Sequence, residues 1–453
     1  MRTIESVFKR QAKNAKVGKL NIINDFTGSG KTFAISTAIS DYCIRELGAV
    51  LIVICQPKLS IWSDKDKQRL KDLGLTEYKN FQEVAQNLVW IEKNKGFIVT
   101  TPNIIGEYVD SQQCDLFKKT IDYLRDRVVI FIDEIHVNSV SNEFNYKACK
   151  GRSSSKYNKY NFYKKGLSNI SKSVKYFWGF TATAHAENKA LLPIDLKIDY
   201  VDVTPPREHR INYSKPTEVI LSKNLYSVMS SNISSMLNFN SSSDDCKKIA
   251  MFQCRSRNSN DHTLADVRKN VCSIIPSQFQ NERSIIIDTS ESTYSISPKE
   301  ILEKKYEARY EKEIIDQEEV YRRLESPDSP EQFLFCVEKY QLGSNLKTLS
   351  QIYSFRDFNY ENGDQIILEK LNQLHGRAVR PNLHPDYFEE YARSLHKLYT
   401  HNLEEGELEE ILDLNSCKLH LIKNPYTTYF KEEWHSKIAV SLEFVREYLE
   451  KLK

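Results

Sequence analysis

NDFTGSGKTF, residues 24–33, combines two glycines with a lysine and two threonines in a short stretch. It continues the apolar run LNIIN and leads into a helical pattern that extends from Lys31 to about Glu46. Glycines whose amides can point inward, the first turn of a helix, an ammonium group and a hydroxyl together bind a nucleotide phosphate and its Mg²⁺ ion. We therefore predict a phosphate-binding loop with Mg²⁺ on Thr32, formed by Thr27, Gly28, Ser29, Gly30, Lys31 and Thr32.

The loop departs from the strict phosphate-loop pattern at one position. That pattern has a glycine five positions before the Gly-Lys pair, and this chain has Asp25 there. A glycine turn that arose by chance is the alternative interpretation. The strand before the loop and the helix after it make that alternative the weaker one.

Short apolar runs with the composition of buried strands follow the loop along the chain. Strand, loop, helix and strand in this order are typical of a parallel α/β sheet. Because 453 residues exceed what one hydrophobic core holds, we predict two such domains. The runs are AVLIVIC (49–55), GFIVTT (96–101), VVIFID (128–133), YFWGFT (176–181), KIAMFQC (248–254), RSIIIDT (283–289) and QFLFCV (332–337).

Changes in composition predict the boundaries of these domains. We expect the first domain over residues 1–204, a proline-containing linker over 205–216, the second domain over 217–383 and a short helical C-terminal region over 384–453. Three stretches differ from the rest. They are a basic insertion at about 144–175, a Ser- and Asn-rich stretch at about 230–243 expected to be a flexible loop, and a charged insertion at about 297–331 expected to include a solvated helix.

The overall composition predicts a soluble protein of a reducing compartment. No apolar run approaches the roughly 20 residues that span a bilayer, so no membrane partner is expected. The nine cysteines are scattered and never spaced as C-x-x-C, which argues against a disulfide framework and a zinc site. We expect a cytoplasmic location, or one at a nucleoid or replication site. The abundance of Asn, Lys, Ile and Tyr hints at the AT-rich genome of a phage, virus or plasmid.

An acidic pair ends one of the predicted strands. VVIFIDEIH carries Asp133 and Glu134 where a buried strand stops, and ligands of open parallel sheets bind at the carboxyl ends of the strands. Asp133 would hold Mg²⁺, and Glu134 would orient and deprotonate a water molecule against the γ-phosphate. Alone, such a pair is usually a solvated strand end; after a phosphate-binding loop it is a stronger signal.

Two arginines a turn apart lie at the start of a predicted helix in the second domain. NQLHGRAVRP contains Gln373, Gly376, Arg377 and Arg380. Guanidinium groups supply a large electrostatic stabilisation to a phosphoryl group in transfer. A basic helix face is the alternative, and it would be preferred if this were the only signal in the chain.

Together these segments resemble the motifs of superfamily 2 helicases and translocases. DFTGSGKT resembles motif I, DEIH motif II, GFTATAH the Thr-Ala-Thr of motif III, and QLHGRAVRP the Q-x-x-G-R-x-x-R of motif VI, all in family order. There are also four weaker matches. ICQPKLS resembles motif Ia, VTTPN the next segment that contacts nucleic acid, FQCRSR motif IV and EKYQLGSNL motif V. The resemblance covers roughly Lys9 to Pro381. It implies two RecA-like domains that hydrolyse ATP with Mg²⁺ as cofactor.

The resemblance also implies roles for individual residues. Gln11 would contact the adenine, and Gly343 would face the nucleotide. Gln373, Arg377 and Arg380 would act on the γ-phosphate. His136, Thr181 and Thr183 would couple hydrolysis to domain movement. The implied contacts to a nucleic-acid backbone are Pro57, Lys58, Thr100, Thr101, Arg255, Arg257 and Ser344.

Two departures from the family patterns bear on the substrate. Motif VI lacks the leading His-Arg and the second glycine of DEAD-box RNA helicases. GFTATA is more similar to DNA translocases of the type III restriction and repair class than to the Ser-Ala-Thr of RNA helicases. These features favour DNA over RNA as the partner.

The basic insertion is not explained by the motifs. No acidic residue lies between Glu143 and Glu187, whereas nine lysines and arginines alternate there with tyrosines and a phenylalanine. Cations and aromatic faces bind the phosphates and unpaired bases of single strands. A solvated insertion with some buried tyrosines is an equally good interpretation.

The combined hypothesis is an ATP-dependent helicase or translocase that moves along or unwinds nucleic acid. Two alternatives stay open beside it. One is a nucleic-acid-dependent ATPase switch or assembly factor that does not unwind, or an RNA helicase. The other is a phosphate-loop kinase or small-molecule NTPase whose later motifs are accidental; stimulation of hydrolysis by nucleic acid separates it from the rest.

Overall fold

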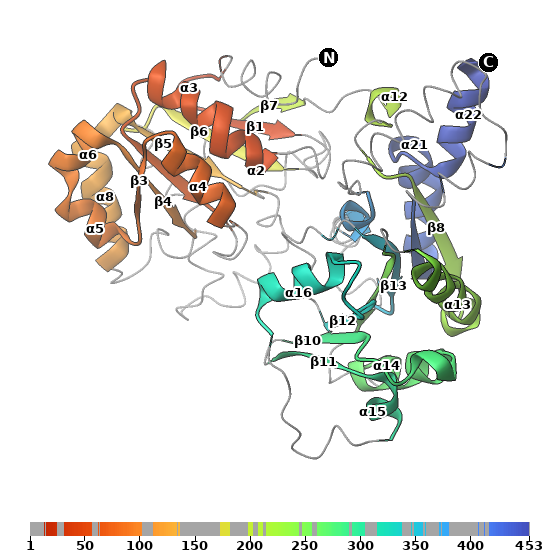
Figure 1. The fold of residues 1–453 in the computed structure, drawn as a ribbon. Coiled ribbons are helices and arrows are strands. Elements are labelled where there is room, and N and C mark those ends of the chain that lie inside the picture. Colours follow the sequence, from red (N-terminus) through yellow and green to blue (C-terminus); the bar gives the residue numbers. More distant parts are fainter. Residues whose placement is uncertain are drawn as a thin grey trace. The chain divides into compact units, whose positions relative to one another are not determined.

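A computed structural model gives the fold of the chain. The residues it describes are 13, 15–24, 31–56, 62, 64–101, 112–133, 135, 173–181, 198–202, 207–211, 214–243, 247–255, 261–289, 292–303, 315–337, 346, 348–356, 358, 371–372, 374–379, 406, 412 and 416–452. The chain divides into two compact units, Met1–Pro205 and Pro206–Lys453, each built around its own sheet (Figure 1).

The first unit contains a seven-stranded sheet in which all neighbouring strands are parallel. Its strands lie in the order β3-β4-β2-β5-β6-β1-β7. β2 and β5 are buried along their whole length, because helices cover both faces of the sheet. The strands are β1 (Leu20–Asn24), β2 (Leu51–Cys55), β3 (Thr76–Tyr78), β4 (Gly96–Thr100), β5 (Val128–Ile132), β6 (Tyr176–Thr181) and β7 (Ile198–Asp202).

Two groups of helices form the two faces of this unit. α5 (Phe81–Gln86), α6 (Leu88–Asn94) and α8 (Gln112–Leu124) pack on one face, where Phe81, Ile91 and Phe117 join the core. The other face carries one continuous helix with a π-helical turn in its middle, and α4 beside it (Figure 1). These segments are α2 (Lys31–Ala34), η1 (Ile35–Ile39), α3 (Ser40–Arg45) and α4 (Asp64–Asp72).

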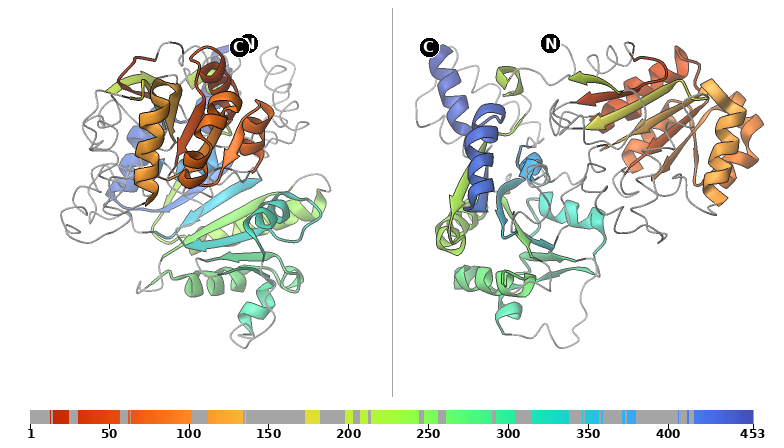
Figure 2. Two further views of the ribbon diagram at one scale, coloured as in Figure 1. Left: turned by 90° about the vertical axis from the view of Figure 1, so that its left-hand side faces the viewer. Right: turned by 180° about the vertical axis from the view of Figure 1, so that it is seen from behind.

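The second unit also contains a seven-stranded sheet, in the order β11-β10-β12-β9-β13-β14-β8. All its pairs are parallel except the edge pair β10–β11. α13, α14 and α15 pack on one face, whereas α16, residues 371–372 and 374–379 and the π-helical turn η10 (Phe430–His435) pack on the other (Figure 2). The strands are β8 (Thr217–Ser222), β9 (Ile249–Cys254), β10 (Ile285–Asp288), β11 (Thr293–Ile296), β12 (Phe333–Val337), β13 (Leu349–Ser354) and β14 (Cys417–Ile422). The helices are α13 (Tyr226–Ser242), α14 (Leu264–Ile274), α15 (Pro298–Leu302) and α16 (Gln317–Glu325).

These sheets confirm the predicted fold class of two RecA-like α/β folds in tandem. The prediction of a flexible loop at about 230–243 is wrong, because residues 230–242 lie in α13. Met229, Ile233, Met236 and Leu237 repeat at helical spacing and are all buried against the sheet. Burial of that stripe outweighs the weak helix propensity of the serines and asparagines between its members.

The sequence predicted a helical C-terminal region, but the structure also contains a β-strand there. Cys417–Ile422 forms β14, which pairs with β13 on one side and β8 on the other. The expected helices follow it: α20 (Pro425–Tyr429), the π-helical turn η10 (Phe430–His435), α21 (Ser436–Ile438) and α22 (Leu442–Leu452). The expected linker also has structure, since α12 (Arg207–Arg210) packs against this region through Arg207, whose guanidinium lies 3.7 Å above the Phe444 ring.

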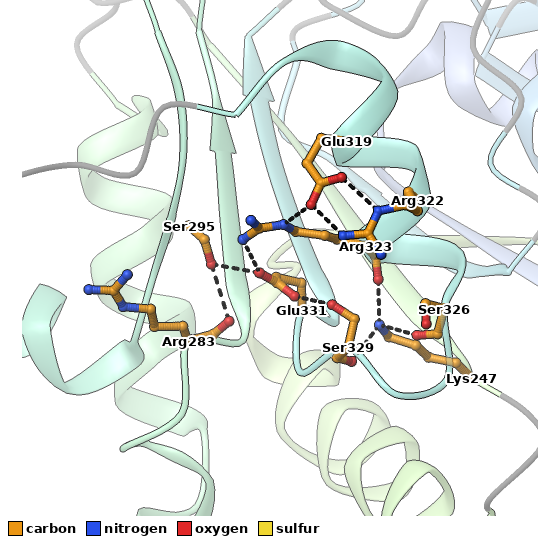
Figure 3. Close-up of polar contacts among 9 residues, drawn as sticks. All are labelled: Lys247, Arg283, Ser295, Glu319, Arg322, Arg323, Ser326, Ser329 and Glu331. Carbon is orange, nitrogen blue, oxygen red and sulfur yellow. Dashed lines mark hydrogen bonds and ion pairs between the residues drawn. The ribbon is translucent and has the colours of Figure 1, made fainter.

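The charged insertion is more buried than a solvated helix would be. Val320 and Leu324 of α16 are fully buried on the sheet. A polar network then fixes the end of α16 (Figure 3). The Lys247 ammonium donates to the carbonyl groups of Arg323, Ser326 and Ser329 at 2.8, 3.0 and 2.7 Å, and Arg323 donates to Glu331 at 3.2 Å. Lys247 therefore caps the last turn of the helix.

Candidate nucleotide-binding site

The carboxyl edge of the first sheet brings three predicted motifs together. β6 lies between β5 and β1, with Ile132 opposite Gly179 and Asn24 opposite Thr181. The phosphate-binding loop leaves β1 at Asn24, and Asp133 follows β5 directly. Motifs I, II and III therefore end on neighbouring strands at one edge, where open parallel sheets bind ligands.

Lys31 and Thr32 lie in the first turn of the helix that follows the loop. Both residues are half-buried, and Ala34 and Ile35 behind them are fully buried against the sheet. The helical segment continues through η1 to Arg45, so its amino end is firmly anchored. Backbone amides at the start of a helix and a lysine ammonium are groups that suit an anion. Residues 25–30, with Thr27, Gly28, Ser29 and Gly30, lie outside the described residues.

Asp133 is held rigidly at the end of β5. Its side chain belongs to a residue only 3% exposed, and its backbone amide donates to the Cys55 carbonyl at 2.8 Å. Ile135 is fully buried, and a Cβ on Gly179 would come within 2.8 Å of the Ile135 side chain. The glycine in motif III thus allows motif II to lie close to β6.

A carboxylate and a hydroxyl at one sheet edge fit the predicted magnesium site. Mg²⁺ takes few protein ligands and is completed by phosphate oxygens and water, and Asp133 and Thr32 offer the oxygen donors it prefers. Among the described residues there is no group of three or more His, Cys, Asp or Glu side chains that could hold a metal by itself.

Some of the residues predicted to contact nucleic acid are buried or bonded to other residues of the protein. Thr100 and Thr101, at the end of β4, are 2% and 9% exposed, so their side chains offer little surface. Arg255 follows β9 and donates through Nε to the Phe355 carbonyl at 2.8 Å, and it also pairs with Asp261. In this structure these side chains stabilise the fold; contacts to a strand stay a prediction.

Arg377 lies in a buried helical segment of the second unit. It is 6% exposed, and every described residue from Leu374 to Val379 is buried. The amide of Lys215 donates to the Val379 carbonyl at 2.7 Å, and the Thr217 hydroxyl lies 2.9 Å from Nε2 of His375. The residues just before and at the start of β8 therefore hold the segment that carries the arginine.

Sequence reasoning missed the contribution of the C-terminal region to this segment. His435 and Trp434 of η10 both contact His375 by edge-to-face ring packing, at 5.2 and 5.0 Å between centroids. The histidine inside motif VI was the available signal, because a histidine next to a buried helix face needs a polar partner.

Of the other predicted site residues, the structure describes the backbone of Thr181 alone. Thr181 is the last residue of β6. The remaining ones lie outside the described residues: Gln11, Pro57, Lys58, Glu134, His136, Thr183, Arg257, Gly343, Ser344, Gln373 and Arg380. Nearly all of the basic insertion at about 144–175 does too, although its last residue, Lys175, forms an exposed ion pair with Asp126 at 2.6 Å.

Comparisons with known proteins identify solved structures with a similar fold. No protein-family model and no curated protein matches the chain. A solved structure of the DUF1998 helicase MrfA bound to DNA and AMPPNP is similar over 99% of this chain and 50% of that one, with a TM-score of 0.55 and 14% identity. Mss116p bound to ssRNA and AMP-PNP is similar over 100% of this chain and 80% of that one, with a TM-score of 0.51 and 12% identity.

The fold of this chain, two RecA-like α/β units in tandem, is therefore similar to the folds of these two helicases. The chain spans about half the length of the MrfA chain to which it is similar. In the part of the chain that the structure describes, no helix is both long and apolar enough to cross a membrane.

Proposed function

We propose that the protein is a nucleic-acid-stimulated ATPase that moves along or unwinds a strand. The observation that supports the proposal is the shared carboxyl edge of β1, β6 and β5, because the helix that begins with Lys31 and Thr32 follows β1 and Asp133 directly follows β5. A phosphate-loop kinase would not need a second RecA-like fold with a buried arginine such as Arg377. The superfamily 2 helicase fold of the whole chain therefore favours a motor.

Each residue has a defined task in this proposal. Lys31 neutralises charge on the β- and γ-phosphates, and Glu134 orients and deprotonates the attacking water. Thr32 and Asp133 hold Mg²⁺, which stabilises the developing phosphate charge when bound. Arg377 and Arg380 act as arginine fingers on the transferring phosphoryl group, and Gln373 assists them. Thr181, Thr183 and His136 connect hydrolysis to movement.

Nucleic acid is the proposed partner because similar structures were solved with it. MrfA was bound to DNA and Mss116p to ssRNA, so these structures do not choose between the two substrates. The motif III sequence GFTATA favours DNA. Lys58, Arg257 and Ser344 are the proposed backbone contacts, together with the basic insertion at about 144–175.

ATP turnover measured with single- and double-stranded DNA and RNA tests the proposal. Stimulation by at least one of the four, and its loss in Lys31→Ala, are the expected results. Equal turnover with and without every nucleic acid would contradict it and favour a small-molecule NTPase. A strand-displacement assay on the same samples then separates a helicase from a switch, because a switch hydrolyses ATP without separating strands.

A further inference from the structure

Three distant parts of the chain meet at the Arg377 helix, if the helix itself is counted as one of them. The helical segment 374–379 is contacted by Lys215 and Thr217 at the start of β8 and by η10 near the C-terminus. Thr217 links all three. Its hydroxyl lies 2.9 Å from Nε2 of His375 and 2.9 Å from Nε2 of His435, and its own side chain has no exposed surface.

The bridge His375–Thr217–His435 is built for neutral imidazoles. Burial, followed by His435 and Arg210, lowers the pKa of His375 well below its ordinary value. Burial, followed by Arg207 and Lys431, lowers the pKa of His435 to about 4. A threonine hydroxyl has a single proton, so it can donate to one imidazole while it accepts from the other. The two histidines therefore need different tautomers. Nε2 of one ring accepts the proton of the Thr217 hydroxyl, and the Nε2–H group of the other ring donates to the hydroxyl oxygen.

The π-helical turn η10 makes the contact possible. A π-helix closes its turn with one residue more than an α-helix, which brings residues four and five apart toward the same face. Phe430, Trp434 and His435 accordingly all reach His375, with ring centroids at 6.3, 5.0 and 5.2 Å. Phe430 and Trp434 stack on each other at 5.0 Å and 15°. π-helical turns are frequent at functional sites.

We propose that Thr217 and His435 are positioning residues for Arg377, so that the C-terminal region is a working part of the ATPase motor. This inference rests on the proposed role of Arg377 in hydrolysis. The bridge fixes the rotation and depth of the helix at His375, which precedes Arg377 by two positions. A displacement of about 1 Å at a reacting group can cost about 100-fold in rate, so a small shift of this helix is enough to slow turnover.

Turnover kinetics of full-length variants test the proposal. His435→Leu removes the hydrogen bond and replaces the imidazole by an apolar side chain of similar size. We expect it to lower the nucleic-acid-stimulated kcat by about 10- to 100-fold, with little change in the KM for ATP. His435→Gln, whose amide can replace Nε2, should recover most of the lost kcat. Thr217→Val and Thr217→Ser form a second pair with the same expected contrast.

Two controls separate positioning from simple loss of stability. Val445→Ala opens a cavity in the same C-terminal region, where Val445 packs with Ile211, Leu412 and Val440 instead of the bridge. The Val445→Ala substitution should lower the melting temperature, and it should leave kcat unchanged at temperatures well below that melting temperature. In a double-mutant cycle, Thr217→Val combined with His435→Leu should be no slower than the slower single variant, because both remove one bridge.

The outcomes also distinguish this proposal from the proposed function. If Arg377→Ala abolishes turnover while His435→Leu and Thr217→Val turn over like the wild type, the positioning role is refuted and the ATPase stands. If Arg377→Ala turns over normally, the role of the arginine itself is refuted, and the positioning proposal is refuted with it. If Val445→Ala slows turnover as much as His435→Leu, the effect is general destabilisation and the bridge has no special part.

Discussion

His420, buried in β14 of the second sheet, should make this unit sensitive to acid. Its ring is fully buried and stacks on Tyr353 at 4.3 Å and 11°. Phe252 and Phe335 continue the stack across β9 and β12, with centroid distances of 5.3 and 4.6 Å. Among the described residues, neither nitrogen of His420 has a hydrogen-bond partner. A charged imidazole is therefore strongly disfavoured there.

The size of the effect follows from the shift of the pKa. Burial, followed by Lys418, lowers the pKa of His420 from 6.5 to about 4. At about 1.4 kcal/mol for each pH unit, this difference corresponds to about 3 kcal/mol. Since the folded pKa is depressed, the unfolded chain binds the proton first as the pH falls. The stability is fully present above about pH 6.5 and is lost between pH 6.5 and about 4.

The substitution His420→Phe tests this reasoning, because it keeps the stack and removes the titrating group. We expect the variant to be at least as stable as the wild type at pH 7.5, since two unsatisfied polar atoms disappear. Relative to the wild type it should gain about 3 kcal/mol as the pH falls to about 4.

Hydrogen exchange measured at β13 and β14 reports this free energy for the second unit alone. Rates are corrected for the intrinsic pH dependence of exchange, and β2 and β5 of the first unit serve as an internal reference. If the wild type and His420→Phe lose protection in parallel between pH 7.5 and 4.5, His420 does not have a depressed pKa and the explanation is wrong.

Three further substitutions test other parts of the structure. Lys31→Ala should abolish hydrolysis and weaken nucleotide binding, because it removes the ammonium from the phosphates; wild-type turnover in a phosphate-release assay would reject the site. Glu134→Gln should bind Mg-ATP but hydrolyse it slowly, since an amide cannot accept the proton; loss of Mg-ATP binding by calorimetry would mean that Asp133 and Glu134 have other roles. Lys247→Met should destabilise the second unit by about 2 kcal/mol or more, because it leaves three carbonyl groups without their donor, and denaturant unfolding that matches the wild type would refute that role.

The sequence predicts the first sheet well because its signals are local. The strands LIVIC and VVIFI are buried on both faces and therefore read as continuous apolar runs. The motifs lie directly at the ends of β1, β5 and β6, so strand order alone brings them together. For Asp133 and Glu134, the position directly after a buried strand was enough to predict a place at the ligand-binding edge of the sheet.

The second unit shows what local signals leave out. CKLHLI contains a lysine and a histidine, and nothing in its own composition shows that it pairs with β8 and β13. The apolar stripe of α13 is present in the sequence but diluted by serines and asparagines. His435 gives no sequence signal at all, because its partner Thr217 is far away in the chain and meets it only when β14 and β8 pair.

The order of the second sheet explains why the C-terminal region cannot be an independent appendage. β14 lies between β13 and β8, so it completes the sheet that positions Thr217. The amide of Thr217 in turn donates to the Val440 carbonyl at 3.0 Å, and Arg207 donates to the Ala439 carbonyl at 2.6 Å. The contacts that hold the Arg377 helix therefore depend on β14, η10 and the turn before α22 together. If Arg377 acts on the phosphate, the smallest unit that can hydrolyse ATP efficiently extends at least through these elements, beyond the last helicase motif.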